Sequence, residues 1–217
     1  MSELRQQLID TARRMASCGL NRGTAGNLSV RARENGEDGF LITPTGMDYD
    51  ALVEDDLVFM RTDGSTVGRR KPSSEWRFHR DIYLARQAAG AILHAHSPFA
   101  TTLACLRRDI PPFHYMIARF GGDTLRCARY ATFGTQALSD AAIDALTDRN
   151  GCLLANHGML VFGKDLAQAL SLGVELEALC EQYWRACQLG APVILDDEEM
   201  TRVIEKFAHY GQQEGAR

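Results

Sequence analysis

The chain has 217 residues, of which 45% are hydrophobic and 24% charged, with a formal net charge of −4. Composition and length suit one globular domain with a large core. The weak acidity and scattered basic residues argue against nucleic acid or an anionic membrane as a partner. No apolar run approaches the roughly 20 residues of a membrane span, and the N-terminus has no signal-peptide core. We therefore expect a cytoplasmic protein.

Helices alternate with short strands along the predicted secondary structure. In chain order the elements are a helix at 3–18, strands from 27, at 40–42 and at 57–61, a helix from Ser73 or Ser74 to about 87, a strand at 91–96, a short helix from Pro98, a helix at 136–148, strands at 151–155 and 159–163, a helix at 165–189 and a helix from about 196. Tight turns favour antiparallel pairing. The sequence predicts one α/β domain over 1–217, with a mainly antiparallel or mixed sheet.

Six cysteines are spread along the chain without a C-x-x-C pair, and most lie in apolar segments. This pattern predicts buried, reduced thiols and not a disulfide framework. The cysteines are Cys18, Cys105, Cys127, Cys152, Cys180 and Cys187.

The segment AILHAHSPFA places two histidines in an apolar strand. Residues i and i+2 of a strand share a face, so His94 and His96 would stand side by side with Cα atoms about 6.6 Å apart. His157, in the tight turn N-H-G, could complete a set of three imidazoles. A single histidine of this kind is more often a hydrogen-bonded packing residue, but the three together favour a metal site.

A carboxylate and three turns add to this pattern. Glu75 begins a predicted helix, where an acid commonly just faces the helix dipole; the alternative is a fourth ligand or a base beside the metal. Turns rich in glycine and hydroxyl groups can cradle a phosphate, although each alone is only a turn. The turn residues are Thr24, Gly26, Asn27, Thr45, Gly46, Ser73 and Ser74.

Several strings together resemble the class II aldolase/adducin-type family over nearly the whole chain. They are GLNRGTAGNLSVR, LITPTG, KPSSEWRFH, the H-x-H strand, IPPFHYMIARFGG, YATFGT, NHG and EKFAHYG. The resemblance implies a three-layer αβα domain, and a homotetramer whose active sites lie at subunit interfaces. It also implies one zinc ion per subunit, a position that cobalt or manganese could also fill.

The resemblance assigns a role to each candidate residue. His94, His96 and His157 match the zinc ligands, and Glu75 matches a carboxylate that contacts zinc and moves protons. The seven turn residues match a phosphate-binding loop. Tyr115 matches a tyrosine supplied by the neighbouring subunit, whereas Phe133 and Tyr210 match residues that shape the aldehyde side. Two further histidines, His79 and His209, are expected to be partly exposed or packing residues. Residues from about 207 to 217 are expected to form a mobile tail.

The implied reaction is reversible retro-aldol cleavage of a ketose 1-phosphate of the L-fuculose 1-phosphate type. Its products would be dihydroxyacetone phosphate and a short aldehyde such as L-lactaldehyde. The alternatives are a 5-deoxyribulose or ribulose 1-phosphate aldolase, and a sugar-phosphate 4-epimerase or dehydratase on the same fold. A more remote alternative is a non-catalytic interaction module of the adducin type, which has no need of a complete ligand set.

Overall fold

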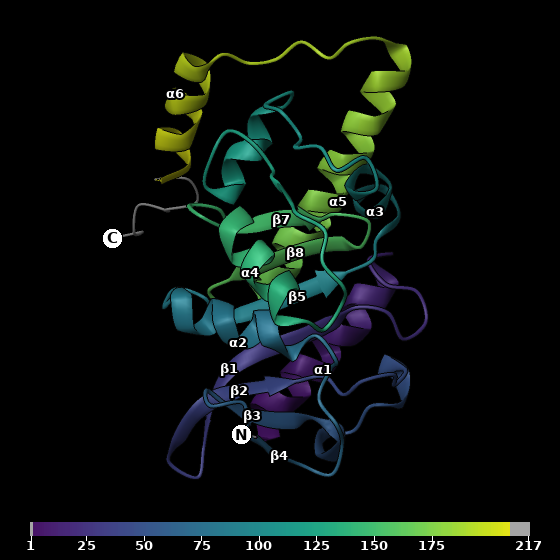
Figure 1. Ribbon diagram of the computed structural model, residues 1–217, viewed down its shortest axis with the longest axis vertical. Coiled ribbons are helices and arrows are strands. Elements are labelled where there is room, and N and C mark those ends of the chain that lie inside the picture. The colour runs from purple at the N-terminus through teal and green to yellow at the C-terminus, as the bar shows by residue number, and fades with distance from the viewer. Residues whose placement is uncertain (1, 209–217) are drawn as a thin grey trace, which may run out of the picture.

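A computed structural model, which describes residues 2–208, places eight strands in one sheet (Figure 1). The strands are β1 (Asn27–Glu34), β2 (Glu37–Ile42), β3 (Val58–Arg61), β4 (Thr66–Val67), β5 (Ala91–Ala95), β6 (Cys127–Ala128), β7 (Gly151–Leu154) and β8 (Gly158–Gly163). Their order is β4-β3-β2-β1-β5-β8-β7-β6. All neighbours pair antiparallel except β6 and β7, which are parallel. The expected mixed, mainly antiparallel sheet is confirmed.

Six α-helices and three short 3-10 helices complete the described part of the chain. They are α1 (Ser2–Ser17), α2 (Trp76–Ala85), α3 (Pro98–Ala104), α4 (Gln136–Ala145), α5 (Leu166–Leu189) and α6 (Asp197–Ala208), with η1 (Tyr49–Ala51), η2 (Glu54–Asp56) and η3 (Tyr115–Phe120). Every predicted helix is present, and the ends differ from the prediction by at most three residues. None of these helices is long and apolar enough to cross a membrane.

Helices cover both faces of the sheet and produce the expected αβα layers (Figure 1). Side chains alternate between the faces of a strand, so β5 feeds two cores. Leu93 and Ala95 join the core beneath α1, α3 and α5, while Ile92 joins the core beneath α2 and α4. His94 lies on this second face, with its ring against Phe78 of α2. The alternation read from the sequence therefore explains how an apolar strand presents a histidine.

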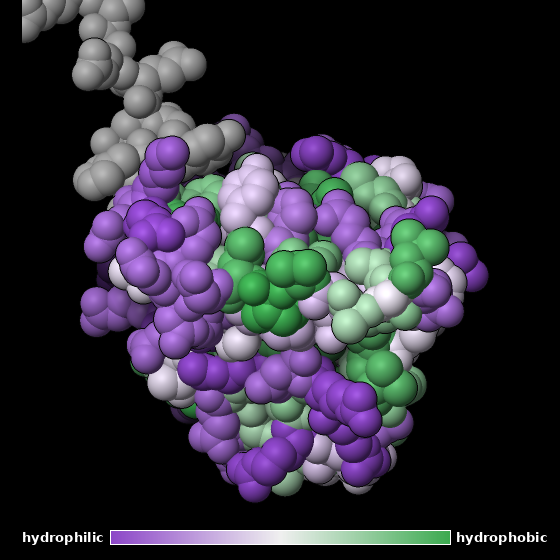
Figure 2. Space-filling model, turned by 90° about the horizontal axis from the view of Figure 1, so that it is seen from above, coloured by the Kyte–Doolittle hydropathy of each residue, from purple (hydrophilic) through white to green (hydrophobic). Residues whose placement is uncertain are grey.

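The last helix, α6, packs beside η3 at one end of the molecule (Figure 1). Its buried Met200 and half-buried Val203 belong to the core of the α1, α3 and α5 face. Figure 2 views this end and shows hydrophobic side chains gathered among hydrophilic ones. In the connection from α5 to α6, Leu189 is 94% exposed and Val193 is 87% exposed.

Three local predictions need correction. The N-cap of α2 is Glu75, and not Ser73 or Ser74; Ser73 instead accepts a hydrogen bond on its Oγ from the Glu75 N–H. The six cysteines are free as expected, but Cys152 and Cys180 alone are buried. Residues 207 and 208, which were expected to belong to a tail, are part of α6. Residues 209–217 lie outside the described part of the chain, so the expectations for the tail, His209 and Tyr210 stay predictions.

Candidate metal centre and substrate pocket

Three histidines meet where β5 ends and the turn between β7 and β8 passes. The imidazole centroids of His94, His96 and His157 lie 4.7–4.8 Å apart, each ring edge-on to the others. The close approach of the turn depends on Gly158, because a Cβ there would lie 2.4 Å from the Ala95 carbonyl oxygen. The sequence separates His157 from His96 by 60 residues, and the antiparallel pairing of β5 with β8 joins them.

His94 is oriented for metal binding by a backbone carbonyl. Its Nδ1 lies 2.8 Å from the Met159 carbonyl oxygen. A carbonyl can only accept, so Nδ1 carries a proton and donates it. The other nitrogen, Nε2, faces the cluster, 2.9 Å from Nε2 of His96 and 3.1 Å from Oε2 of Glu75. This is the arrangement that commonly fixes a metal-ligating imidazole.

Glu75 brings a buried carboxylate to the histidines from the start of α2. Its Oε1 lies 3.2 Å from His157 Nε2 yet accepts no well-aligned hydrogen bond. Its Oε2 accepts a hydrogen bond from the Asn27 amide. Burial alone would raise the pKa of Glu75, but His94, His157 and Asn27 outweigh it and lower that pKa to about 2. A buried, ionised oxygen without an aligned donor is suited to a cation.

His96 and His157 are neutral ligands near pH 7. Burial lowers the pKa of His96 to about 4 and that of His157 to about 3. The donor atoms of these two residues, His94 and Glu75 lie within 4.8 Å of one another. Donors around one tetrahedral zinc lie about 3.4 Å apart, so small side-chain movements would bring all four onto one ion. Three imidazoles and a carboxylate thus fit a divalent metal.

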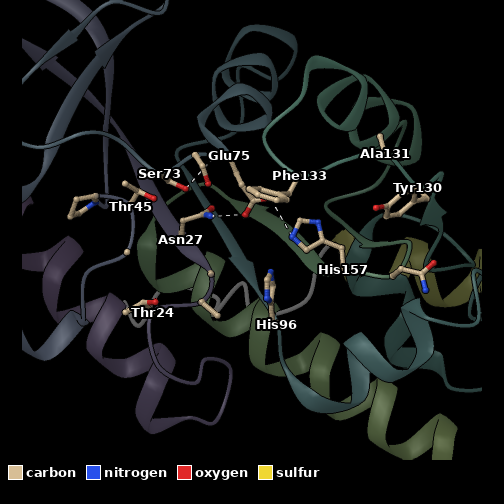
Figure 3. A pocket seen from close by; sticks show the side chains of 16 residues that line it. Thr24, Asn27, Thr45, Ser73, Glu75, His96, Tyr130, Ala131, Phe133 and His157 are labelled. Atoms are coloured by element: carbon tan, nitrogen blue, oxygen red, sulfur yellow. Dashed lines mark hydrogen bonds and ion pairs between the residues drawn. The ribbon is translucent and has the colours of Figure 1, made fainter.

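A cavity of about 310 Å³ opens above this cluster (Figure 3). It brings together all seven predicted turn residues, Glu75, two of the histidines and Phe133, whereas His94 is fully buried beneath it. The lining residues are Thr24, Ala25, Gly26, Asn27, Pro44, Thr45, Gly46, Ser73, Ser74, Glu75, His96, Tyr130, Ala131, Phe133, Asn156 and His157. None of them is lysine or arginine, so within this chain an anion would meet hydroxyls, amides and helix-end N–H groups.

Backbone hydrogen bonds tie the second and third turns together. The Ser73 N–H donates to the Thr43 carbonyl, and the Thr45 N–H donates to the Lys71 carbonyl. Gly26 has φ +78° and lies against β5, where a Cβ would be 2.7 Å from the His94 carbonyl oxygen. The glycine therefore allows the first turn to approach the metal cluster directly.

The far side of the cavity is largely apolar. Tyr130, Ala131 and Phe133 line it; Figure 3 shows Tyr130 and Ala131 across from Thr24 and Thr45, with Phe133 between them. Phe133 is 64% exposed. The loop that carries it is fixed to α2, because Arg77 donates a hydrogen bond to the Gly134 carbonyl at 2.6 Å.

Tyr115 lies elsewhere in the chain. It is 51% exposed on η3 and lines a separate groove between η3 and α6. Its ring stacks on His114 and on Phe207. The structure therefore brings Phe133, but not Tyr115, to the metal cluster within this chain.

Sequence reasoning missed two kinds of site residue. Tyr130, Ala131 and Asn156 line the cavity; they lie in the strings YATFGT and NHG, but no role was predicted for them from the sequence. His79 is completely buried beneath the site, so the expectation of a packing residue is confirmed and the alternative of a partly exposed one is wrong. Its position four residues after Glu75, one helical turn away, was the available signal.

The fold and a complete donor set define a metal-dependent enzyme of a known class. Residues 6–184 match the model of the family described as Class II Aldolase and Adducin N-terminal domain. The chain belongs to this family and is a class II, metal-dependent aldolase, an aldehyde-lyase.

Similar proteins narrow the comparison further. A 5-methylthioribulose-1-phosphate/5-deoxyribulose-1-phosphate aldolase from Rhodospirillum rubrum is 54% identical over 208 residues, covering 96% of this chain and 92% of that protein. The L-fuculose phosphate aldolase of Escherichia coli K12 is 44% identical over 211 residues, covering 97% and 96%. A solved L-fuculose 1-phosphate aldolase structure superposes with a TM-score of 0.91 at 42% identity, covering 96% and 97%. The family resemblance is confirmed, but the identities favour the 5-deoxyribulose alternative over the fuculose type.

Proposed function

We propose that the protein cleaves a 5-deoxypentulose 1-phosphate, such as 5-deoxyribulose or 5-methylthioribulose 1-phosphate, into dihydroxyacetone phosphate and acetaldehyde or (methylthio)acetaldehyde, respectively. One observation carries the proposal: the metal cluster and the anion-binding turns share one cavity. A ketose 1-phosphate needs both, a cation beside its carbonyl and a cradle for the phosphate two bonds further along. The relative at 54% identity carries this substrate in its name.

The metal, which we propose to be zinc, supplies Lewis-acid stabilisation of the charge that develops on the C2 carbonyl. His94, His96, His157 and Glu75 would hold it. The turn residues bind the phosphate and so orient the sugar with contacts remote from the reacting bond.

Two side chains would move protons. During cleavage the C4 hydroxyl loses its proton, the electron pair of the C3–C4 bond moves toward C2, and C3 takes up a proton. Glu75 lies at the cluster and is placed to deliver the proton to C3, and to remove it in the reverse direction. Tyr115, from a neighbouring subunit, would exchange the proton on the C4 oxygen.

The far wall of the cavity supports a 5-deoxy substrate. Cleavage of such a sugar leaves an aldehyde that ends in a methyl or methylthio group, and Tyr130, Ala131 and Phe133 offer an apolar surface for it. Asn156, the polar residue nearby, already accepts a hydrogen bond from Arg107 on its side-chain oxygen. L-Fuculose 1-phosphate is the second candidate, because relatives at 44% identity carry that activity in their names.

We further propose a homotetramer in which η3 of one subunit reaches the cavity of the next. The half-exposed Tyr115 and the exposed hydrophobic residues around the α5–α6 connection support a subunit contact at this end. Sedimentation velocity tests the assembly; a protein that stays monomeric at assay concentrations while fully active would contradict it.

The reaction is tested with three ketose 1-phosphates and a coupled assay for dihydroxyacetone phosphate. We expect kcat/KM to be highest for 5-deoxyribulose or 5-methylthioribulose 1-phosphate and at least tenfold lower for L-fuculose 1-phosphate, since one misplaced hydroxyl or methyl group costs about 1–3 kcal/mol. Preference for the fuculose ester would establish the second candidate. Epimerisation without release of dihydroxyacetone phosphate would overturn both.

A further inference from the structure

A continuous chain of buried hydrogen bonds runs from Tyr83 of α2, by way of β1, to the carboxylate of Glu75. Tyr83 OH lies 2.9 Å from Ser29 Oγ, and Ser29 Oγ lies 2.7 Å from His79 Nδ1. His79 Nε2 lies 2.5 Å from Asn27 Oδ1, and Asn27 Nδ2 lies 3.1 Å from Glu75 Oε2. The members come from β1 and from α2 with its N-cap, and each is at most 6% exposed.

The direction of every bond in this chain follows from its last member. The ionised carboxylate can only accept, so the Asn27 amide must turn its NH₂ group toward Glu75 and its oxygen toward His79. That oxygen requires a donor, which places the proton of His79 on Nε2. Nδ1 then accepts from the Ser29 hydroxyl, and Ser29 in turn accepts from Tyr83. With His79 neutral, no other arrangement of protons satisfies all five groups.

The neighbouring groups preserve this arrangement. Burial keeps His79 neutral near pH 7 by lowering its pKa to about 3. Burial also raises the pKa of Tyr83 far above 10, so its hydroxyl stays a donor. Phe78 packs against the His79 ring, which restricts rotation of the imidazole. The chain therefore has one direction and no mobile charge.

We propose that His79 is a positioning residue: through Asn27 it holds the Glu75 carboxylate in the orientation that both the metal cluster and proton transfer require. This role rests on the proposed function, which makes Glu75 the group that moves a proton. Asn27 also lines the cavity. A rotated Asn27 amide would therefore turn its oxygen toward the carboxylate and would also disturb the anion-binding turns. Outer groups of this kind typically change metal affinity or activity 10- to 100-fold.

Two substitutions separate positioning from packing. His79→Leu removes the donor to Asn27, whereas His79→Gln supplies an amide with both a donor and an acceptor. Ile82→Val is the matched control, because Ile82 is fully buried on the same helix and belongs to the same core but makes no bond in the chain. Each variant is purified with zinc bound, and its zinc affinity is measured by competition with a chromogenic chelator, alongside kcat and KM.

We expect His79→Leu to lower zinc affinity and kcat by about 10- to 100-fold. His79→Gln should recover most of both quantities. Ile82→Val should leave both within about twofold of the wild-type values. Equal values for the leucine and glutamine variants would overturn the proposal, as would a wild-type zinc affinity and kcat in His79→Leu.

The tautomer of His79 gives a test on the unaltered, zinc-loaded protein. Nitrogen-15 NMR of labelled histidine should show a neutral ring protonated on Nε2. A ring protonated on Nδ1 would overturn the proposal, whatever the enzyme cleaves. Conversely, wild-type protein that cleaves no ketose 1-phosphate would defeat the proposed function, while the zinc affinities and the tautomer would still test the hydrogen-bond chain.

Discussion

The group of four metal-binding side chains and the η3–α6 end of the molecule differ in one respect. A single chain completes the first as a ligand set, but it does not complete a site around the second. At the first, four ligand side chains converge and neighbouring groups fix their orientation. The glycine- and hydroxyl-rich turns line the same cavity. At the other end, Tyr115 is half-exposed in a groove of about 1130 Å³ with no donor of the cluster beside it. The difference is that one chain brings together all four metal-binding side chains, whereas Tyr115 could reach such a group only in another subunit, as we propose.

Replacing the Glu75 carboxylate should have the largest effect on kcat. Glu75→Gln keeps the shape of the side chain but removes the base, so we expect kcat to fall about 10²- to 10⁴-fold while zinc remains bound by three histidines. Stopped assays and elemental analysis on the same sample measure both. Wild-type turnover would reduce Glu75 to a helix cap.

Removing the Tyr115 hydroxyl should lower kcat less than replacing Glu75 does. The same variant can also show which subunit uses this hydroxyl. Tyr115→Phe should lower kcat by about 10²-fold and leave zinc content unchanged. Coexpression of this variant with Glu75→Gln then tests the division between subunits. If Tyr115 serves a neighbour, random mixed tetramers regain about a quarter of wild-type activity; recovery of none would place both residues in the same subunit's site.

One methyl group added at Gly26 should disturb the contact between the turn at residues 24–27 and strand β5. Gly26→Ala places a Cβ 2.7 Å from the His94 carbonyl oxygen, so we expect KM for the sugar phosphate to rise about tenfold through lost phosphate alignment. Gly23→Ala is the matched control, because Gly23 has φ +60° but nothing within 4 Å of an added Cβ. Equal KM values for the two variants would show that backbone strain, and not contact with β5, sets the effect.

Acid should destabilise the fold through the buried histidines. The pKa of His79 falls from 6.5 to about 3 on folding, so between these values the unfolded chain binds a proton that the native chain does not. Stability is therefore full above pH 6.5 and is lost as the pH falls. His79 alone should lower the free energy of unfolding by about 2 kcal/mol at pH 5 relative to pH 8. Urea titrations of wild type and His79→Gln measure this; identical pH slopes would contradict it.

The sequence predicts the local features of the metal site better than the contacts between distant segments. The alternation of apolar residues with His94 and His96 predicts a shared face, and glycine and hydroxyl residues mark the turns, because period and turn chemistry are local properties. The layers and the mixed sheet follow from the same local signals. The meeting of His157 with β5 depends on strand pairing over 60 residues, and motif resemblance indicated it in advance.

His79 and the far wall could not be predicted in this way. A histidine on an amphipathic helix reads as polar surface, and only the packing of α2 onto β1 shows it to be buried between Ser29 and Asn27. Tyr130 and Asn156 lie in the recognised strings YATFGT and NHG, but only the folded chain shows that these separate loops line one cavity.

The most direct measurement of the central claim is stepwise reloading of the metal-free protein. A chelator removes the metal, zinc is returned in fractions of one ion per chain, and release of dihydroxyacetone phosphate from 5-deoxyribulose 1-phosphate is followed at each step. We predict no release without metal, a linear rise with added zinc, and a plateau at one ion per chain. Full release from the metal-free protein would contradict the account.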